Sequence, residues 1–477
     1  MMFKKALNIT SLILLALISG SSPGVSGTES AEAKTASKPN IVLVLADDMS
    51  WFDVGAYHRQ FDYVPNNAIT PNIDRVASEG MLFTRSFTAT AMCAPTRMQL
   101  YTGLYPVRNG AYGNHTRVYD NVKSAAHYFR EHGYRVGLSG KGHIFPRKAF
   151  PFERSGKENK GNKEESTFGI KQTRKFMARN NNQPFFLVIA SANPHEPWNR
   201  GSTSLYPPNK LKLPAFLNDT PSLRHRLSKY LAEVSDLDRE VGLVDDELDK
   251  LGIKNDTIFI FTSEQGNSLP FGKWTNYDAG LRNAFIIRWP NKIKANVSTD
   301  AMIEYVDIIP TLTDLATNSI PDKLDGESFK AVLQGQATEH KTHVFGVQTS
   351  LNIHYGAPYP IRSVRGEQFK LIHNLIPDNN FSNILTYNHW FKEELAEEKK
   401  TTNDNYARYV KRPEFELYDM VKDPFEQNNI INEPKYSHQV TALKKELVKW
   451  MEQQGDIGIG TEMTVCDRKG FNHRGCN

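Results

Sequence analysis

The sequence predicts an α/β domain, with a buried parallel sheet covered by helices on both faces, followed by a smaller α+β C-terminal domain. Apolar runs of strand length alternate with helical patterns from residue 39 to about residue 330. Several runs are apolar at every position, which suits strands buried on both faces. After about residue 340 the runs become shorter and are separated by turns. We therefore place the two domains at residues 28–340 and 341–477.

Four buried strands and one long helix are indicated in the first domain. The predicted strands are the apolar runs Ile41–Ala46, Phe185–Ala190, Thr257–Phe261 and Phe285–Ile287. Apolar residues at spacings of three and four predict a helix from Leu231 to Leu251, with Gly252 as its end. Strand–helix–strand alternation of this kind is typical of parallel sheets with crossover helices.

The C-terminal domain is expected to hold a small antiparallel sheet and a closing helix. Residues Arg362–His373 predict two short strands around a Gly-containing turn, and Phe415–Tyr418 predicts another strand. The closing helix is expected at Val440–Trp450. The charged segments 154–166 and 394–412 have little apolar periodicity, so we expect surface loops there.

Composition and the N-terminal residues restrict the class of protein. The chain has 477 residues, 39% of them hydrophobic, and a formal net charge of +5. This is enough apolar material for a large core and too little charge to indicate nucleic-acid binding. The absence of any run of 18 apolar residues predicts no membrane-spanning helix. Residues 1–27 combine Lys4-Lys5, the apolar run Leu12–Ile18 and small residues at 25–27. They predict a signal peptide and an exported, periplasmic or secreted protein.

The three cysteines fall into two groups. Cys466 and Cys476 lie ten residues apart near the C-terminus. In an exported protein we expect them to form a disulfide, which would stabilise the fold by about 2–3 kcal/mol. Cys93 is then left alone, and an odd thiol in an exported protein needs a chemical explanation.

Polar clusters follow three of the predicted strands. Asp47-Asp48 follows the first, Asn193–Pro197 the second and Glu264-Gln265 the third. Ligands bind at the carboxyl ends of parallel strands, so we expect these residues to form one site. Carboxylate and amide oxygens without a dense Cys or His set favour Ca²⁺, or Mg²⁺, over zinc.

The segment Cys93–Arg97 reads C-A-P-T-R and is followed by MQLYTG. It resembles the maturation motif of sulfatases, in which the cysteine is oxidised to formylglycine. Five further segments are similar to motifs of the same family, and the chain is identified as a member of the type I, formylglycine-dependent sulfatases of the alkaline phosphatase superfamily. These segments are NIVLVLADD from Asn40, GKGH from Gly140, PHEP from Pro194, GKWT with YDAGLR from Gly272, and FELYDMVKDPFEQNN from Phe415.

The resemblance implies an alkaline phosphatase-like fold with a large mixed, mostly parallel sheet. It also implies a maturation enzyme that generates the formylglycine, and one calcium ion. The implied metal ligands are Asp47, Asp48, the modified Cys93, Glu264 and Gln265. The sequence departs from the family pattern at two places. Glu264-Gln265 stands where Asp-Asn or Asp-His is usual, and Gly142 stands where Trp is common. We expect Gly142 to open space beside Lys141.

The resemblance also implies the catalytic roles. Arg97, Lys141 and Lys273 are expected to stabilise the charge of the sulfate group. The hydrated formylglycine attacks sulfur, His195 is the candidate general acid and His143 the candidate base. The family implies a sulfated sugar as substrate, and the side chains that we expect at the entrance are His115, Trp198 and Arg200.

Several functions stay open at this point. The first is an O-sulfatase acting on a sulfated polysaccharide or its oligosaccharides. Local similarity to heparan sulfamidase-like proteins, in ADDMSWFDVGAYH, TGLYPVRNGAYGNH and GKGHIFPRKAFPF, suggests an N-sulfoglucosamine sulfamidase as the second. A phosphoester or phosphonate hydrolase of the same superfamily is a third. The fourth is a non-catalytic protein that binds sulfated glycans and leaves Cys93 unconverted.

Overall fold

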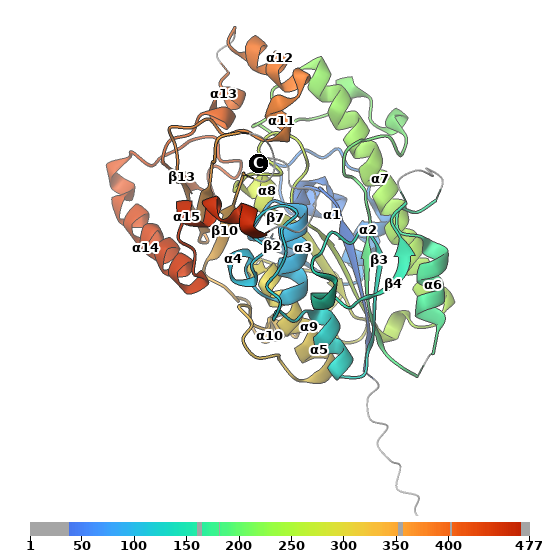
Figure 1. The fold of residues 1–477 in the computed structure, drawn as a ribbon. Coiled ribbons are helices and arrows are strands. Elements are labelled where there is room, and N and C mark those ends of the chain that lie inside the picture. Colours follow the sequence, from blue (N-terminus) through green and yellow to red (C-terminus); the bar gives the residue numbers. More distant parts are fainter. Residues whose placement is uncertain (1–37, 160–164, 181, 352–355, 401–402, 469–477) are drawn as a thin grey trace, which may run out of the picture. The chain divides into compact units, whose positions relative to one another are not determined.

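Two sheets organise the chain in the computed structural model, which describes residues 38–159, 165–180, 182–351, 356–400 and 403–468 (Figure 1). The expected signal peptide at residues 1–27 and Cys476 lie outside the described residues. Within the described chain the larger sheet has nine strands in the order β4-β3-β5-β1-β6-β7-β2-β8, with β9 beside β2. The strands are β1 (Asn40–Ala46), β2 (Met81–Phe87), β3 (Arg135–Gly140), β4 (Glu153–Lys157), β5 (Phe185–Ala190), β6 (Thr257–Ser263), β7 (Arg282–Arg288), β8 (Val297–Thr299) and β9 (Ile303–Glu304).

The sheet is mixed and mostly parallel, as predicted, but one predicted parallel strand is antiparallel. Strand β7, which contains the run Phe285–Ile287, is antiparallel to both of its neighbours, β6 and β2. Every residue of β7 is buried, because the strand lies in the middle of the sheet. The apolar run Phe285–Ile287 therefore predicted a buried strand correctly. Burial on both faces, however, does not determine whether a strand is parallel or antiparallel to its neighbours.

Alternate residues of the central strand enter two different cores. Val42 and Val44 of β1 pack into one core, and Ile41, Leu43 and Leu45 pack into the other. The first core is covered by α1 (Gly55–His58), α2 (Pro71–Ser78), α6 (Ile170–Ala178) and α7 (Pro221–Lys250). The second is covered by α3 (Cys93–Thr102), α5 (Ala125–Glu131), α9 (Ile308–Thr317) and α10 (Lys330–Leu333). This is the expected sheet between two helical layers.

Helix α7 is the predicted long helix, and it begins ten residues earlier than its apolar pattern indicated. Thr220 caps it by accepting a hydrogen bond from the Leu223 amide, and Pro221 occupies its first turn. The helix ends at Lys250, just before Gly252, whose φ of +66° favours glycine. The extra N-terminal turns are largely polar on their outer face, so hydrophobic periodicity does not reveal them.

The second sheet is four-stranded and antiparallel, in the order β10-β11-β12-β13. Its strands are β10 (Val344–Gln348), β11 (Ile361–Arg365), β12 (Phe369–Asn374) and β13 (Phe415–Asp419), and α14 (Ser437–Gln454) packs on it. The predicted strands and closing helix of the C-terminal region are confirmed. Strand β10 begins at Val344, and the exact domain boundary at 340/341 stays a prediction. The remaining helices are α4 (Pro106–Asn109), α8 (Asp278–Leu281), α11 (Ile384–Tyr387), α12 (His389–Glu398), α13 (Asn405–Val410) and α15 (Ile459–Met463).

Two segments that were expected to be loops contain regular structure. Residues 153–157 form β4 at the edge of the large sheet, where an exposed strand tolerates charged side chains. Residues 389–398 and 405–410 form α12 and α13. These helices bury Trp390, Phe391 and Tyr406, aromatic side chains that are separated by charged stretches in the sequence.

Candidate active site

The candidate site lies at the carboxyl ends of three neighbouring parallel strands, as predicted. Strands β5, β1 and β6 are adjacent and parallel. The backbone continues this pairing beyond the strands, because the Asp47 amide donates to the Asn193 carbonyl at 2.9 Å and the Glu264 amide to the Ala46 carbonyl at 3.1 Å. The polar segments that follow the three strands are thereby held side by side.

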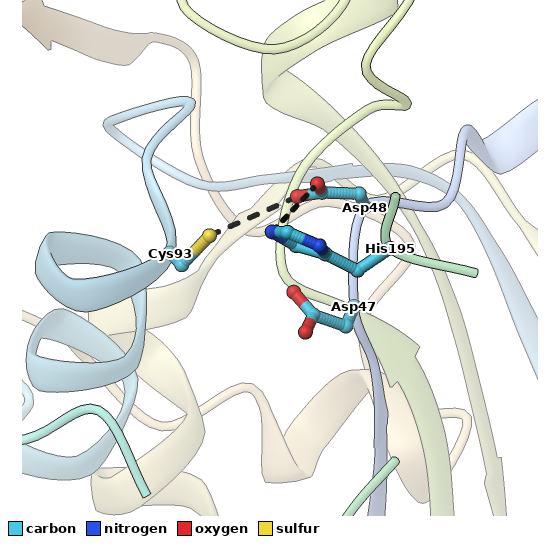
Figure 2. A group of neighbouring side chains, drawn as sticks. All are labelled: Asp47, Asp48, Cys93 and His195. Carbon is cyan, nitrogen blue, oxygen red and sulfur yellow. Dashed lines mark hydrogen bonds and ion pairs between the residues drawn. The ribbon is translucent and has the colours of Figure 1, made fainter. Parts of the chain in front are cut away.

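Four side chains converge at this edge. Figure 2 shows Cys93, the first residue of α3, facing the carboxylates of Asp47 and Asp48 and the imidazole of His195. One ligand atom from each lies within 4.8 Å of the others. The Cys93 thiol is 3.8 Å from Asp48 Oδ1, and His195 Nε2 is 3.5 Å from Asp48 Oδ2. Asp48 has a φ of +63°, a left-handed conformation that is uncommon for residues other than glycine and is enriched at functional sites.

Two buried lysines neutralise the two aspartates. Lys141 Nζ lies 2.5 Å from Asp47 Oδ2, and Lys273 Nζ lies 2.7 Å from Asp48 Oδ2. Burial raises the pKa of Asp47, but Lys141 and neighbouring positive groups outweigh that effect and hold the pKa below its ordinary value. Burial opposes the charge of Lys273, but Asp48 outweighs it and raises the pKa of the ammonium. These shifts favour the charged forms of the Asp47 carboxylate and the Lys273 ammonium.

The two buried lysines also act on position 93. Burial alone would raise the pKa of the Cys93 thiol, but Lys141 and Lys273 lower it well below its ordinary value. The surroundings thus favour an anion at the N-terminus of α3. Arg97, one turn later on the same helix, is fully buried and donates from Nη1 to the Lys141 carbonyl at 3.1 Å.

The buried oxygens at this edge fit a cation. Among the described residues, Asp47 Oδ1 and Gln265 Oε1 are buried and accept no hydrogen bond. Gln265 Nε2 donates to Asp48 Oδ1 at 2.5 Å and to the Cys93 sulfur at 3.7 Å, so its amide lies inside the cluster. Two carboxylates and an amide oxygen are ligands suited to Ca²⁺ or Mg²⁺.

The adjacent residue Glu264 has a different environment. Its carboxylate is fully buried and forms an ion pair with the Arg97 guanidinium. The predicted ligand set is therefore only partly brought together in this structure. Asp47, Asp48, Cys93 and Gln265 converge, Glu264 pairs with Arg97, and His195, expected to be a general acid, also lies within ligand distance of the group.

His143 lies beside the cluster in a buried position. Burial lowers the pKa of His143 to about 4, and the contact with Cys93 only partly offsets this effect. The ring is therefore neutral at neutral pH and able to accept a proton. His115 packs against it with the ring centroids 4.8 Å apart.

The three side chains expected at the entrance have different environments. His115 contacts His143, and Trp198 borders a pocket next to His195. Arg200 is 5% exposed, and its Nε donates to Asp236 at 2.8 Å. We therefore expect Arg200 to hold the His195 loop against α7 rather than to contact substrate.

Sequence reasoning missed two side chains near the site. Ser268 donates from Oγ to Asp48 Oδ2 at 2.9 Å; only its position three residues after Gln265 pointed to it. Arg154 occupies the space that Gly142 was expected to open, because a Cβ at Gly142 would lie 3.1 Å from Arg154 Nη1. Arg154 comes from β4, the edge strand that the sequence did not reveal.

Two further predictions concern the C-terminal disulfide and membrane-spanning helices. Cys476 lies outside the described residues, so its pairing with Cys466 stays a prediction. No described helix is long and apolar enough to cross a membrane.

Comparison with known proteins supplies a family and a fold. A family model described as "Sulfatase" matches residues 39–319, and one described as "N-sulphoglucosamine sulphohydrolase, C-terminal" matches residues 266–385. An ulvan-active sulfatase of Formosa agariphila is 32% identical, with 88% of this chain and 81% of that protein covered. The N-sulphoglucosamine sulphohydrolase of Homo sapiens is 29% identical, with 90% of this chain and 93% of that protein covered.

The fold is also found among solved structures. One protein, determined in complex with its substrate D-glucosamine-2-N,6-O-disulfate, superposes with a TM-score of 0.66. The alignment covers 88% of this chain and 99% of that one, at 21% identity. At this identity the similarity establishes the architecture, which agrees with the predicted alkaline phosphatase-like fold.

Proposed function

The chain belongs to the sulfatase family and is a sulfuric ester hydrolase, and from this premise we propose that it is an exported enzyme acting on a sulfated polysaccharide or its oligosaccharides. Its nucleophile is a formylglycine generated from Cys93 by a maturation enzyme. One observation supports this above the others: Cys93 is buried among Asp47, Asp48 and His195, with all four ligand atoms within 4.8 Å. A reactive group at position 93 therefore lies next to the candidate cation site and near Lys141 and Lys273.

A calcium ion, or magnesium in its place, would be held by Asp47, Asp48, Gln265 and the group at position 93. Glu264 stays a candidate ligand, provided that Arg97 releases it. Such an ion supplies positive charge that acidifies a bound hydroxyl and neutralises the sulfate oxygens. Arg97, Lys141 and Lys273 add fixed positive charge to the same small volume, where low exposure strengthens each interaction.

The first half of the reaction transfers the sulfuryl group to the enzyme. A hydroxyl of the hydrated formylglycine gives its proton to solvent water and attacks sulfur, and the bond between sulfur and the sugar oxygen breaks with its electron pair on that oxygen. His195 donates a proton to the departing sugar oxygen. Burial opposes the charge of His195, but Asp48 outweighs it and raises the pKa of the imidazole above its ordinary value, which favours the protonated ring.

The second half releases sulfate. His143, neutral because burial lowers its pKa to about 4, accepts the proton of the remaining hydroxyl at position 93. The carbon–oxygen bond to sulfate then breaks, the electron pair leaves with sulfate, and the aldehyde re-forms. Addition of water restores the hydrate. A serine at this position would lack this internal route, because its sulfate ester has no second hydroxyl.

A second candidate function is hydrolysis of the N-sulfate of glucosamine. The match of residues 266–385 to the C-terminal model of N-sulphoglucosamine sulphohydrolases favours it. The ulvan-active relative favours an O-sulfated polysaccharide instead. One purified sample assayed with O-sulfated sugars, N-sulfoglucosamine and aryl phosphates separates the two functions, because sulfate release from O-sulfated sugars alone supports the first. Turnover of phosphate esters alone would overturn both.

Three further features complete the proposal. Residues 1–27 direct export to the periplasm or the exterior, where Cys466 and Cys476 form a disulfide. Residues 28–340 form the catalytic domain and residues 341–477 the C-terminal domain. If purified protein from a host with a maturation enzyme keeps Cys93 as a thiol and releases no sulfate, the non-catalytic glycan-binding function replaces this one.

A further inference from the structure

A large pocket opens beside His195. Its volume is about 1030 Å³, and it is lined by the His195–Trp198 loop, the first turns of α7 and the start of α12. Helices α7 and α12 lie next to each other at this point (Figure 1), since Thr220 at the start of α7 donates to Glu394 of α12. The pocket is thus built jointly by the large domain and a helix of the C-terminal region.

The position of His195 determines what this pocket must contain, if the proposed function holds. His195 donates its proton to the sugar oxygen that leaves sulfur, so that oxygen lies next to the imidazole. Atoms bonded beyond that oxygen extend away from the buried lysines and Asp47. His195 is one of the side chains that line the pocket. The pocket therefore accommodates the part of the substrate that departs from sulfate.

The walls of the pocket are rigid and aromatic. The Trp198 indole donates to the Pro194 carbonyl at 2.8 Å and packs on Tyr230 of α7, with ring centroids 5.6 Å apart. On the opposite side, the Arg226 guanidinium lies over the Trp390 ring, 4.3 Å from its centroid. The Trp198 ring, which these contacts hold in place, suits packing against the apolar face of a sugar ring, whereas Arg226 covers the Trp390 ring.

One side of the pocket carries three basic side chains, all from α7. His225, Arg226 and Lys229 project from one face of α7, at positions spaced by one, three and four residues. Within the described part of the chain, the exposed side chains of His225 and Lys229 form no ion pair or hydrogen bond. The two acids of the pocket lie beside other basic groups of the same pocket, because Glu196 is 3.4 Å from Arg226 and Glu393 is 3.3 Å from His389. Among the described residues, no carboxylate lies within ion-pair distance of Lys229, so its exposed ammonium is available to an anionic group in the pocket.

We propose that this pocket binds a second, acidic sugar residue of the substrate, and that Lys229 and His225 contact its anionic group while Trp198 packs against its ring. The acidic group is the carboxylate of a uronate or a further sulfate. The enzyme would then distinguish an acidic oligosaccharide from an isolated sulfated sugar. This inference rests on the proposed function, since it assumes that the sulfate is cleaved beside His195.

The test measures binding rather than turnover, so that it can fail independently of catalysis. Calcium-loaded Cys93→Ala protein is titrated calorimetrically with three disaccharides that share one sulfated ring. The neighbouring ring is a uronate, a sulfated sugar or a neutral sugar. The same titrations are run with Lys229→Ala, Lys229→Glu and His225→Ala added. Lys449→Ala, an exposed lysine on α14 outside the pocket, is the matched control.

The expected result is a preference of about three- to fivefold for an acidic over a neutral neighbour, the size of a partly exposed ion pair. Lys229→Ala and His225→Ala should reduce this preference, Lys229→Glu should invert it, and Lys449→Ala should keep it. Comparison of the uronate and sulfated sugars identifies the acidic group. Equal affinity for all three disaccharides, or a preference that survives Lys229→Glu, overturns the inference. Failure of the proposed function would be recognised separately, as absence of sulfate release from any sugar by the Cys93 protein.

Discussion

Glu240 on α7 holds the segment that leads to His195, and its titration gives a quantitative prediction. The carboxyl group is fully buried and accepts hydrogen bonds from the Thr167 amide and from the Ser191 hydroxyl at 2.6 Å. Burial raises the pKa of Glu240 from 4.5 to about 7, and these hydrogen bonds offset only part of the effect. Ser191 directly follows β5, so Glu240 fixes the start of the His195 loop.

The sign of the pH effect follows from proton binding. Between pH 4.5 and pH 7 the folded protein keeps the proton on Glu240, whereas the unfolded chain releases it. The contribution of Glu240 to the free energy of unfolding is therefore fully present below pH 4.5 and is lost as the pH rises through 7. A difference of two to three pKa units corresponds to about 3 kcal/mol.

The Glu240→Gln variant isolates this effect, because glutamine has the same shape and does not titrate. Urea unfolding of the two proteins at pH 4.5 and pH 8 gives the difference in free energy of unfolding at each pH. We expect the variant to gain about 3 kcal/mol relative to the wild type between these two values. Glu452→Gln, an exposed position on α14, should show no such gain. A Glu240→Gln difference that is the same at both pH values would refute the reasoning.

Three further predictions concern the site itself. Lys273→Met keeps the alkyl stem but removes the ammonium 2.7 Å from Asp48, so kcat/KM should fall about 10²–10³-fold; a loss below tenfold would contradict the electrostatic role. Asp47→Asn removes one charge from the cation site, so elemental analysis should find less calcium and the rate should fall, whereas stoichiometric zinc in the wild type would contradict the ligand argument. Cys93→Ala should abolish turnover with an unchanged circular dichroism spectrum, and residual activity above trace would exclude Cys93 as the source of the nucleophile.

The central strands and their site were predictable because the signals are local. Runs that are apolar at every position located β1, β5 and β6 to within two residues, and the polar residues that end each run located the edge where Asp47 and His195 meet. The direction of β7 was not predictable in this way, since strand direction depends on the connection between strands rather than on the apolar run. Helix α12 was missed because its aromatic side chains pack on other elements: Phe391 stacks on Tyr406 of α13, and Trp390 lies against Arg226 of α7, more than 150 residues earlier in the chain.

Within the site, the sequence could propose side chains but not their orientation. Glu264 forms an ion pair with Arg97 whereas Gln265 contacts Asp48, so Glu264 and Gln265 do not both reach the cluster. Asp47 and Asp48 both reach the cluster, and Asp48 has a left-handed backbone conformation there. Arg154 carries no motif, and only the pairing of β4 with β3 brings it beside Gly142.

The chemical state of Cys93 tests the proposed function most directly. Protein made in a host with a competent maturation enzyme is digested with trypsin, and the peptide Ser86–Arg97 is examined by mass spectrometry before and after hydrazide trapping. We expect the aldehyde and its hydrazone at position 93, in a sample that releases sulfate from sulfated sugars. An unmodified thiol in a sample without sulfatase activity would contradict the formylglycine mechanism, and so would a disulfide between Cys93 and Cys466 or Cys476.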